Sequence, residues 1–223
     1  MAESTFKDRW DFDRWAKSYD ETILRAAQSD DWMFKDYDRI LDKVVDYCDL
    51  SSNNYSTVVD IGAGTGNLAS RFLNRGLRVT GIDPSEEMRK ICKQKYHDIQ
   101  VRAGHFEDIP IPDESTSVIV SAYAFHHLTP VQKEASITKM KRVLRPKGRI
   151  VIADLMFGNR TEEERIKRAL RMAGRGDIVD DIEDEYYGLF DELSNSFRRE
   201  EFVFSGEQLT PFVWIFCAIL TDG

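Results

Sequence analysis

Three glycines at alternate positions form the most informative stretch of the sequence. Gly62, Gly64 and Gly66 follow Asp60 in the segment VVDIGAGTG. Alternating glycines let the main chain approach a ligand closely, because a Cβ there would occupy the ligand's space. A dinucleotide-binding loop requires G-x-G-x-x-G at a helix that faces a pyrophosphate, but Asn67 stands where the third glycine of that pattern would be. An acid ahead of the turn would repel a diphosphate, so the loop favours a ligand that carries positive charge.

A second acid, Asp83, ends the segment RVTGID. A carboxylate at the end of this strand can accept hydrogen bonds from both hydroxyls of a ribose. Nicotinamide cofactors and S-adenosylmethionine both contain ribose, so Asp83 predicts a nucleoside without choosing between them. S-adenosylmethionine has a cationic ammonium and a cationic sulfonium and no phosphate, which suits the acidic approach to the glycine turn.

Two adjacent histidines, His126 and His127, follow the segment VIVSAYAF. They come just after a predicted strand, at the edge where open α/β sheets bind ligands. A role in contacting substrate or transferring a proton is one interpretation, and simple packing beneath the next helix is the other. The three cysteines are far apart and form no zinc-ligand spacing with the histidines, so the sequence predicts no metal site.

Strands and helices that could position these residues alternate along the chain. The predicted strands cover residues 58–61, 78–83, 99–103, 117–122, 149–154, 201–208 and 212–220. The last two are joined by three residues, too few for a crossover helix, so they should form an antiparallel hairpin. Residues 4 to about 48, Thr129 to about Leu144, 161–175 and 180–199 are expected to be helical. We predict an α/β fold, a Rossmann-like doubly wound sheet of seven strands with an antiparallel terminal hairpin and additional N-terminal helices.

Length and charge restrict the classes of function. The chain has 223 residues and a formal net charge of −8, which disfavours nucleic-acid partners. No apolar run is long enough to span a bilayer, and the N-terminus lacks a signal peptide's apolar centre, so we expect a cytoplasmic protein without membrane contact. We expect one structural domain, with residues 1–50 as a helical lid or cap on a cofactor-binding domain at 51–223. The acidic run 177–185 is expected to be a solvated helix start or the guard of a pocket.

Several segments together resemble a known family. The chain resembles class I S-adenosylmethionine-dependent methyltransferases in the segments VVDIGAGTG, VTGIDPSEEM, AGHFEDIPIPDES, VIVSAYAFHHLTP and MKRVLRPKGRIVIAD. It is similar more narrowly to the YrrT-type bacterial methyltransferases in FDRWAKSYDETI, SAYAFHHLT, DEYYGLF and FVWIFCAIL. The resemblance implies in-line transfer of a methyl group from S-adenosylmethionine to a small molecule with a thiol, amine or hydroxyl acceptor. It implies S-adenosylhomocysteine as the product, and a monomer or homodimer.

The resemblance also implies which residues bind the cofactor. Asp60 would hold the ammonium, and Met88 would lie against the adenine. Many family members have an acid where this chain has His105, so the adenine contact could come from His105, from Glu107 or Asp108, or from the main chain of Phe106. The expected cofactor residues are Asp60, Gly62, Ala63, Gly64, Gly66, Asp83, Pro84, Met88, His105, Phe106, Ser121 and Ala122.

The candidates for catalysis are Tyr19, His126 and His127. A thiol acceptor has a pKa near 8.5 and needs little help to lose its proton, whereas an amine or hydroxyl would profit from one of these as a general base. Trp15 and Tyr19 lie one helical turn apart and are expected in a lid; further aromatic candidates for the pocket are Tyr186, Tyr187, Phe190 and Trp214. Two alternatives remain at this point: a cofactor-binding regulatory module without activity, and a nicotinamide-dependent oxidoreductase.

Overall fold

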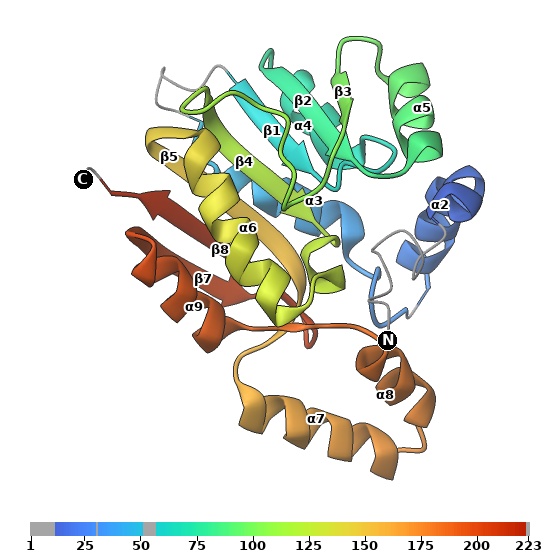
Figure 1. Cartoon of the computed structure of the whole chain (residues 1–223). Coiled ribbons are helices and arrows are strands. Elements are labelled where there is room, and N and C mark those ends of the chain that lie inside the picture. The colour runs from blue at the N-terminus through green and yellow to red at the C-terminus, as the bar shows by residue number, and fades with distance from the viewer. Residues whose placement is uncertain (1–11, 30, 51–56, 222–223) are drawn as a thin grey trace, which may run out of the picture.

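The strands of the chain join one mixed sheet (Figure 1). The computed structural model describes residues 12–29, 31–50 and 57–221. The sheet has the order β3-β2-β1-β4-β5-β8-β7, with the short β6 beside β5. The strands are β1 Thr57–Ile61, β2 Arg78–Asp83, β3 Gln100–Ala103, β4 Thr116–Ala122, β5 Leu144–Phe157, β6 Gly188–Leu189, β7 Phe202–Gln208 and β8 Val213–Leu220.

The pairing of the strands confirms the predicted fold class. Strands β1 to β5 pair in parallel, whereas β8 runs antiparallel to both β5 and β7. Residues Val118 to Val120 of β4 are fully buried, as expected for a central parallel strand that is covered on both faces. The predicted terminal hairpin is therefore present, and β6 is a short addition to the seven predicted strands.

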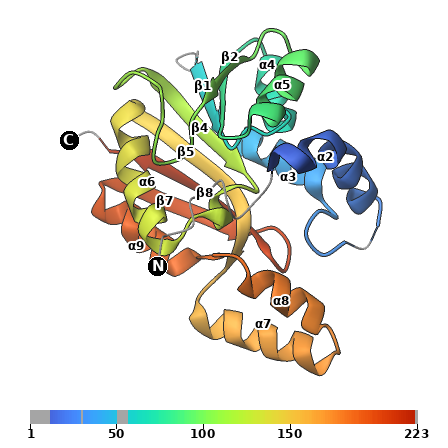
Figure 2. The same cartoon turned by 45° about the vertical axis from the view of Figure 1, so that its right-hand side comes forward.

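Helices cover both faces of the sheet (Figure 2). Phe72 of α4 and Ile40 of α3 belong to the hydrophobic cluster on one face, and Ile137 of α6 and Phe197 of α9 belong to that on the other. The helices are α2 Phe12–Ala27, α3 Tyr37–Tyr47, α4 Asn67–Leu73, α5 Glu86–Lys95, the 3-10 turn η1 Phe125–His127, α6 Pro130–Val143, α7 Arg160–Met172, α8 Gly176–Glu183 and α9 Phe190–Arg199.

One helix prediction was wrong. Residues 180–199 do not form a continuous helix, because α8 ends at Glu183 and α9 begins at Phe190. Between them, Gly188 and Leu189 pair in parallel with Met156 and Phe157 of β5. Hydrogen bonds to distant parts of the chain thus outweigh the helical pattern of the segment.

The predicted N-terminal helix is also interrupted. The side chain of Asp31 accepts hydrogen bonds from the main-chain N–H groups of Met33 and Phe34, at 2.9 and 2.7 Å. Such a local turn competes with helix continuation and separates α2 from α3. The part of the helix prediction at residues 4–11 lies outside the described residues.

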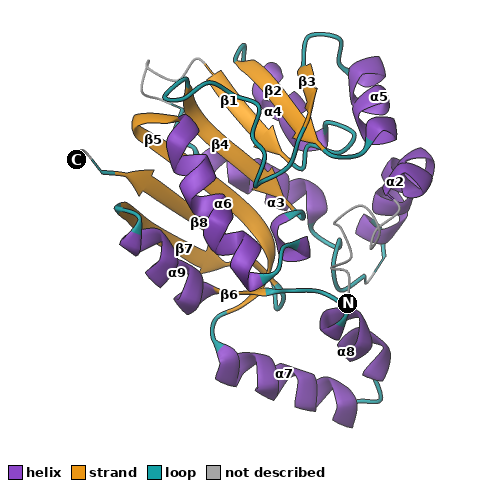
Figure 3. Cartoon of the chain, viewed as in Figure 1, coloured by secondary structure: helices purple, strands orange, loops and turns teal. Residues whose placement is uncertain are grey.

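Helices α7 and α8 form a pair that extends beyond the end of β5 (Figure 3). Strands β1, β2 and β4 all end on the side of the sheet that faces α2. In the described part of the chain, no helix combines the length and apolar character needed to cross a bilayer.

Candidate active site

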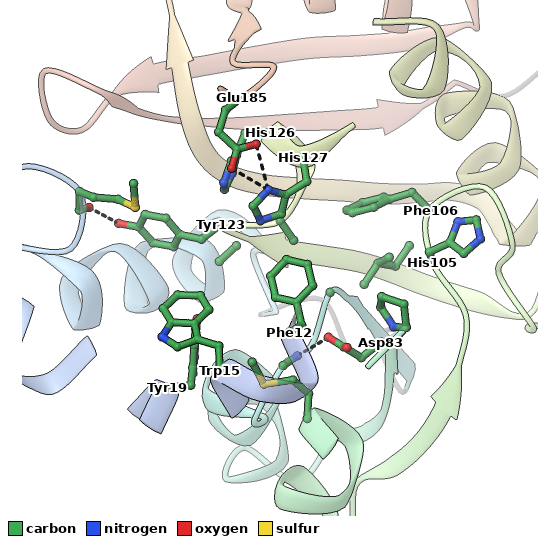
Figure 4. A pocket seen from close by; sticks show the side chains of 18 of the residues that line it. Phe12, Trp15, Tyr19, Asp83, His105, Phe106, Tyr123, His126, His127 and Glu185 are labelled. Atoms are coloured by element: carbon green, nitrogen blue, oxygen red, sulfur yellow. Dashed lines mark hydrogen bonds and ion pairs between the residues drawn. The ribbon is translucent and has the colours of Figure 1, made fainter. Parts of the chain in front are cut away.

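A cavity of about 180 Å³ lies where β1, β2 and β4 end, between these strands and α2. Gly64 and Asp83 line one part of it, and His126, His127 and Glu185 line another (Figure 4). Its wall is mainly apolar, with aromatic side chains from α2, the segment after it and the ends of the strands: Phe12, Trp15, Phe34, Phe106 and Tyr123. The loops after β1 and β2, with Gly64 and Asp83, form the nucleoside corner predicted from the sequence. The cavity joins this corner to the predicted catalytic histidines.

The three glycines of the turn have different reasons to lack a side chain. All three have positive φ angles, of 74° at Gly62, 54° at Gly64 and 90° at Gly66. A Cβ on Gly62 would clash with Ala124, and one on Gly66 would lie 2.7 Å from Cys92 Sγ. Among the described atoms, none lies within 4 Å of a Cβ placed on Gly64. At Gly62 and Gly66 the protein itself therefore excludes a side chain, whether or not a ligand also does.

Asp83 is fixed by the loops on either side of it. Its Oδ2 accepts from the N–H of Gly64 and its Oδ1 from the N–H of Ser85, both at 2.8 Å. Burial raises the pKa of Asp83 to about 6, although these main-chain donors oppose the shift. A carboxylate has lone pairs beyond these two bonds, so it can also accept from hydroxyls in the cavity. Pro84 and Met88 line the cavity beside it.

Asp60 is a buried carboxylate whose charge is not compensated within the described chain. It is 1% exposed, and neither oxygen has a hydrogen-bond partner among the residues described. Burial raises the pKa of Asp60 to about 8 and the charge of Asp83 adds to the rise, whereas the nearby main-chain N–H of Ala69, which does not meet hydrogen-bond geometry, opposes it. Asp60, Ala63 and Tyr19 line a small second cavity, which shares Gly62 and Gly64 with the main one. A buried acid without a partner beside a glycine turn fits a cationic group.

His105 and Phe106 line the cavity on the side expected to receive the adenine. His105 Nδ1 accepts from the N–H of Glu107 at 3.3 Å. The carboxylate of Glu107 accepts from the side-chain amide of Gln132 at 2.9 Å, and Asp108 is exposed. Of the alternatives at this position, His105 and Phe106 thus reach the cavity, whereas neither acid is among its described lining residues.

Two cofactor candidates on β4 differ in position. Ala122 lines the cavity, whereas the hydroxyl of Ser121 donates to the carbonyl of Ile61 at 2.6 Å and is fully buried. Ser121 therefore joins β4 to β1 instead of facing the cavity. The next residue, Tyr123, has a φ of 53° and lines the cavity, and its hydroxyl donates to the carbonyl of Met33 at 3.2 Å.

His126 is held by a buried acid at the end of β5. His126 Nδ1 lies 2.5 Å from Asp154 Oδ1, and the other oxygen accepts from the N–H groups of Phe125 and His126 at 2.5 and 3.0 Å. Burial alone would raise the pKa of Asp154, but the charge and hydrogen bond of His126 hold it below its usual value. Asp154 thus fixes the orientation of the His126 ring.

His127 faces Glu185, which lies between α8 and α9. His127 Nδ1 is 3.1 Å from each oxygen of the Glu185 carboxylate. Burial and the nearby His126 lower the pKa of His127, and Glu185 opposes that shift. The two imidazole rings are 4.0 Å apart between centroids.

Helix α2 is hydrogen-bonded to both loops of the nucleoside corner. Asp20 accepts from the hydroxyl of Thr65 at 2.6 Å and from the amide of Asn67 at 3.0 Å. Asp13 accepts from the hydroxyl of Ser85 at 2.5 Å. These bonds hold α2 over the cavity.

Aromatic residues of α2 face the cavity, whereas the other aromatic candidates pack elsewhere. Trp15 and Tyr19 both line the cavity, with ring centroids 4.8 Å apart. The remaining four, Tyr186, Tyr187, Phe190 and Trp214, are not among the cavity residues that the structure describes. Phe190 packs on Trp214, with ring centroids 4.7 Å apart.

Sequence reasoning missed three acids that shape the site. Asp154 and Asp20 occur in segments that resemble the family, but those segments do not indicate their partners, which lie 28 and 45 residues away in the chain. Glu185 belongs to the acidic run for which a pocket guard was one expectation, but its meeting with His127 spans 58 residues. A local sequence pattern cannot show which residues meet across such separations in the chain.

Comparison with known proteins identifies the family. Residues 59–152 match the family model described as a methyltransferase domain. The chain is 36% identical to an uncharacterised methyltransferase of Oceanobacillus iheyensis, covering 93% of this chain and 94% of that protein. It is 37% identical to another from Geobacillus thermodenitrificans, with the same coverage.

Solved structures show the same fold at lower identity. The YcgJ protein of Bacillus subtilis is 17% identical and has a TM-score of 0.64 over 83% of this chain and 99% of that one. Phosphoethanolamine N-methyltransferase 2 of Haemonchus contortus, in complex with S-adenosyl-L-methionine, is 14% identical and has a TM-score of 0.67 over 82% of this chain and 53% of that one. Fold, family model and relatives agree, and the chain belongs to the class I S-adenosylmethionine-dependent methyltransferases.

Proposed function

We propose that this protein transfers the methyl group of S-adenosylmethionine to a small molecule bound between the nucleoside corner and the histidine pair. The observation that carries the proposal is that Gly64 and Asp83 line one part of the same cavity that His126, His127 and Glu185 line in another part. When bound, the cofactor would supply a methyl group on a sulfonium sulfur, and the neutral thioether that remains after transfer is a good leaving group. The protein's task is then to align the acceptor and keep water out.

The residues of the nucleoside corner fit the cofactor in charge and in shape. Asp60 would hold the ammonium, because it is a buried carboxylate without a partner in the described chain. Asp83 would accept from the ribose hydroxyls with lone pairs that the main chain leaves available. Gly64 leaves the open space that close approach of the methionine part requires.

The acceptor would lie against aromatic side chains and the histidines. Phe12, Trp15 and Phe34 line the cavity there, which suits a small acceptor with an apolar part. Residues 1–50 would act as the lid that keeps water from this space, since α2 is bonded to both cofactor loops.

Tyr19 is a weaker candidate for the base than the histidines. Burial, and then the neighbouring Tyr37, raise the pKa of Tyr19 well above its usual value, so its hydroxyl stays protonated near neutral pH. His126 and His127 are the remaining candidates for managing the acceptor's proton. They can take it up directly, or they can hold an ion that makes the acceptor more acidic. The acceptor's reacting group would be a thiol, amine or hydroxyl.

The test is to incubate the protein with methyl-labelled S-adenosylmethionine and small cytosolic metabolites, and to identify labelled products by mass spectrometry. We expect one labelled small molecule and stoichiometric S-adenosylhomocysteine. Asp83→Ala is the matched control, and it should lose the labelled product at low cofactor concentration. Label that appears only in protein or nucleic acid, when these are supplied, would reject the small-molecule acceptor.

A further inference from the structure

Two imidazoles and a carboxylate converge on the wall of the acceptor cavity. One donor atom each from His126, His127 and Glu185 lies within 4.8 Å of the others. Their side chains are only 6%, 10% and 8% exposed, yet all three line the cavity. Acids and histidines that gather on a surface are usually solvated, but this group is shielded from bulk water and reached from the cavity.

We propose that His126, His127 and Glu185 bind a divalent transition-metal ion such as Zn²⁺, with open coordination positions toward the acceptor. Imidazole nitrogen and carboxylate oxygen are ligands that such ions accept, and three protein ligands with an open position are typical of catalytic sites. The spacing between His127 and Glu185 matches what an ion requires. Ligand atoms at bond lengths of roughly 2.0–2.2 Å lie about 3–3.6 Å apart. His127 Nδ1 is already 3.1 Å from both oxygens of Glu185.

Asp154 completes the arrangement around His126. Its carboxylate holds Nδ1 of the ring at 2.5 Å, which leaves Nε2 as the ligand atom. Metal-binding histidines usually donate their other ring N–H to a carboxylate, which fixes the tautomer and orients the ring. Asp154 is itself held by the main-chain N–H groups of Phe125 and His126. The ring is therefore oriented before any ion arrives.

The main chain next to Glu185 is tied to the segment that carries the histidines. The N–H of Tyr186 donates to the carbonyl of His126 at 3.1 Å. The ammonium of the buried Lys133 donates to the carbonyl of Tyr186 at 2.6 Å. These bonds keep Glu185 beside the two histidines.

Charge also favours an ion. Two buried carboxylates, Asp154 and Glu185, contact the two imidazoles within a mainly apolar wall. The ammonium of Lys133 also interacts with both carboxylates, and a divalent cation held by two neutral imidazoles would supply further positive charge beside them. The ion's role toward the acceptor rests on the proposed methyl transfer. It would bind the acceptor's sulfur or oxygen and lower its pKa, the proton would pass to solvent water, and the histidines would act as ligands instead of bases.

The test uses Co²⁺, whose visible absorption reports binding by protein ligands. Protein treated with a chelator and then titrated should bind one Co²⁺ per chain with a saturable visible band. Glu185→Gln and His127→Asn should each weaken Co²⁺ binding more than tenfold, and Asp154→Asn should weaken it by roughly 10–100-fold. His97→Asn removes an exposed histidine outside the cavity and is the matched control, which should bind as the wild type does.

Circular dichroism and calorimetry with S-adenosylhomocysteine establish that each variant is folded and binds the product. The ion site is rejected if the wild type shows no saturable band, or if Glu185→Gln and His127→Asn bind Co²⁺ as tightly as the wild type. It is also rejected if His97→Asn loses the band. Labelled methyl transfer by a protein that binds no Co²⁺ would reject the ion alone. A Co²⁺ band in a protein that does not bind S-adenosylhomocysteine would support the ion and reject the proposed function.

Discussion

Asn in place of Asp60 should stabilise the ligand-free protein and weaken its binding of cofactor. Each pKa unit is worth about 1.4 kcal/mol, so the rise in the pKa of Asp60 from 3.8 to about 8 corresponds to roughly 5–6 kcal/mol. The folded pKa lies above the unfolded one, so the folded state binds more protons between these values. Wild-type stability is therefore complete below about pH 4 and falls as pH rises through 8. The amide of the Asp60→Asn variant carries no charge, so the stability of this variant does not fall with pH for this reason.

The expected advantage of Asp60→Asn is below about 1 kcal/mol at pH 4 and roughly 4 kcal/mol at pH 7, as an upper bound. Denaturant unfolding at both pH values measures it. Asp98→Asn, which alters an exposed acid, is the control and should show no such trend. If Asp60→Asn and wild type kept the same difference in stability at both pH values, the argument from burial would be refuted.

The same linkage predicts that cofactor binding releases a proton. If Asp60 binds the cofactor's ammonium as proposed, its carboxylate must be ionised in the complex. The wild type should therefore release close to one proton at pH 7 when it binds S-adenosylhomocysteine, and Asp60→Asn should release almost none. Calorimetry in two buffers with different ionisation enthalpies counts the protons. Equal release by both proteins would remove Asp60 from the ammonium site.

Three further substitutions test separate parts of the structure. Asp83→Ala should weaken the binding of S-adenosylhomocysteine by roughly 1–3 kcal/mol in calorimetry, because a buried hydrogen-bonding partner is lost, and unchanged affinity would exclude the ribose contact. Gly66→Ala should lower stability to denaturant by about 1–3 kcal/mol, because the new Cβ meets Cys92; a neutral effect would contradict that packing. Lys133→Met should cost roughly 1–3 kcal/mol of stability, because the buried Lys133 donates to the carbonyls of Leu128 and Tyr186; unfolding at the wild-type denaturant concentration would show that these bonds contribute nothing.

The fold was largely predictable because its signals are local. Strand β1 follows from a short apolar run before a glycine turn. The hairpin follows from a link too short for a crossover helix, which was predicted as three residues and is four residues long in the structure (209–212). Helix α6 begins at Pro130, after the N-cap Thr129, whose capping box with Gln132 is a local signal. Segment 184–189 was not predictable, because its conformation depends on β5, His126 and Lys133, which are distant in sequence.

The candidate site was predictable where short motifs contain the residues that meet. Gly64 and Asp83 occur in such motifs, and they meet in the structure through one hydrogen bond. The sequence could not show why residue 66 must be glycine. The atom that a Cβ there would meet belongs to Cys92 of α5, which follows the next strand in the sequence. Asp154 and Glu185 were missed because their roles arise only when three separate segments meet at the histidines.

The attachment of α2 has a consequence for the speed of turnover. The helix is fastened to the cofactor loops by Asp13 and Asp20, and Lys95 adds an ion pair with Asp20 at 2.7 Å. A cofactor bound beneath α2 would be released more readily when these polar contacts break. Partly exposed ion pairs weaken as salt increases. The residence time of S-adenosylhomocysteine should therefore shorten as ionic strength rises. The rate of repeated turnover would then be limited by the opening of α2 and not by methyl transfer.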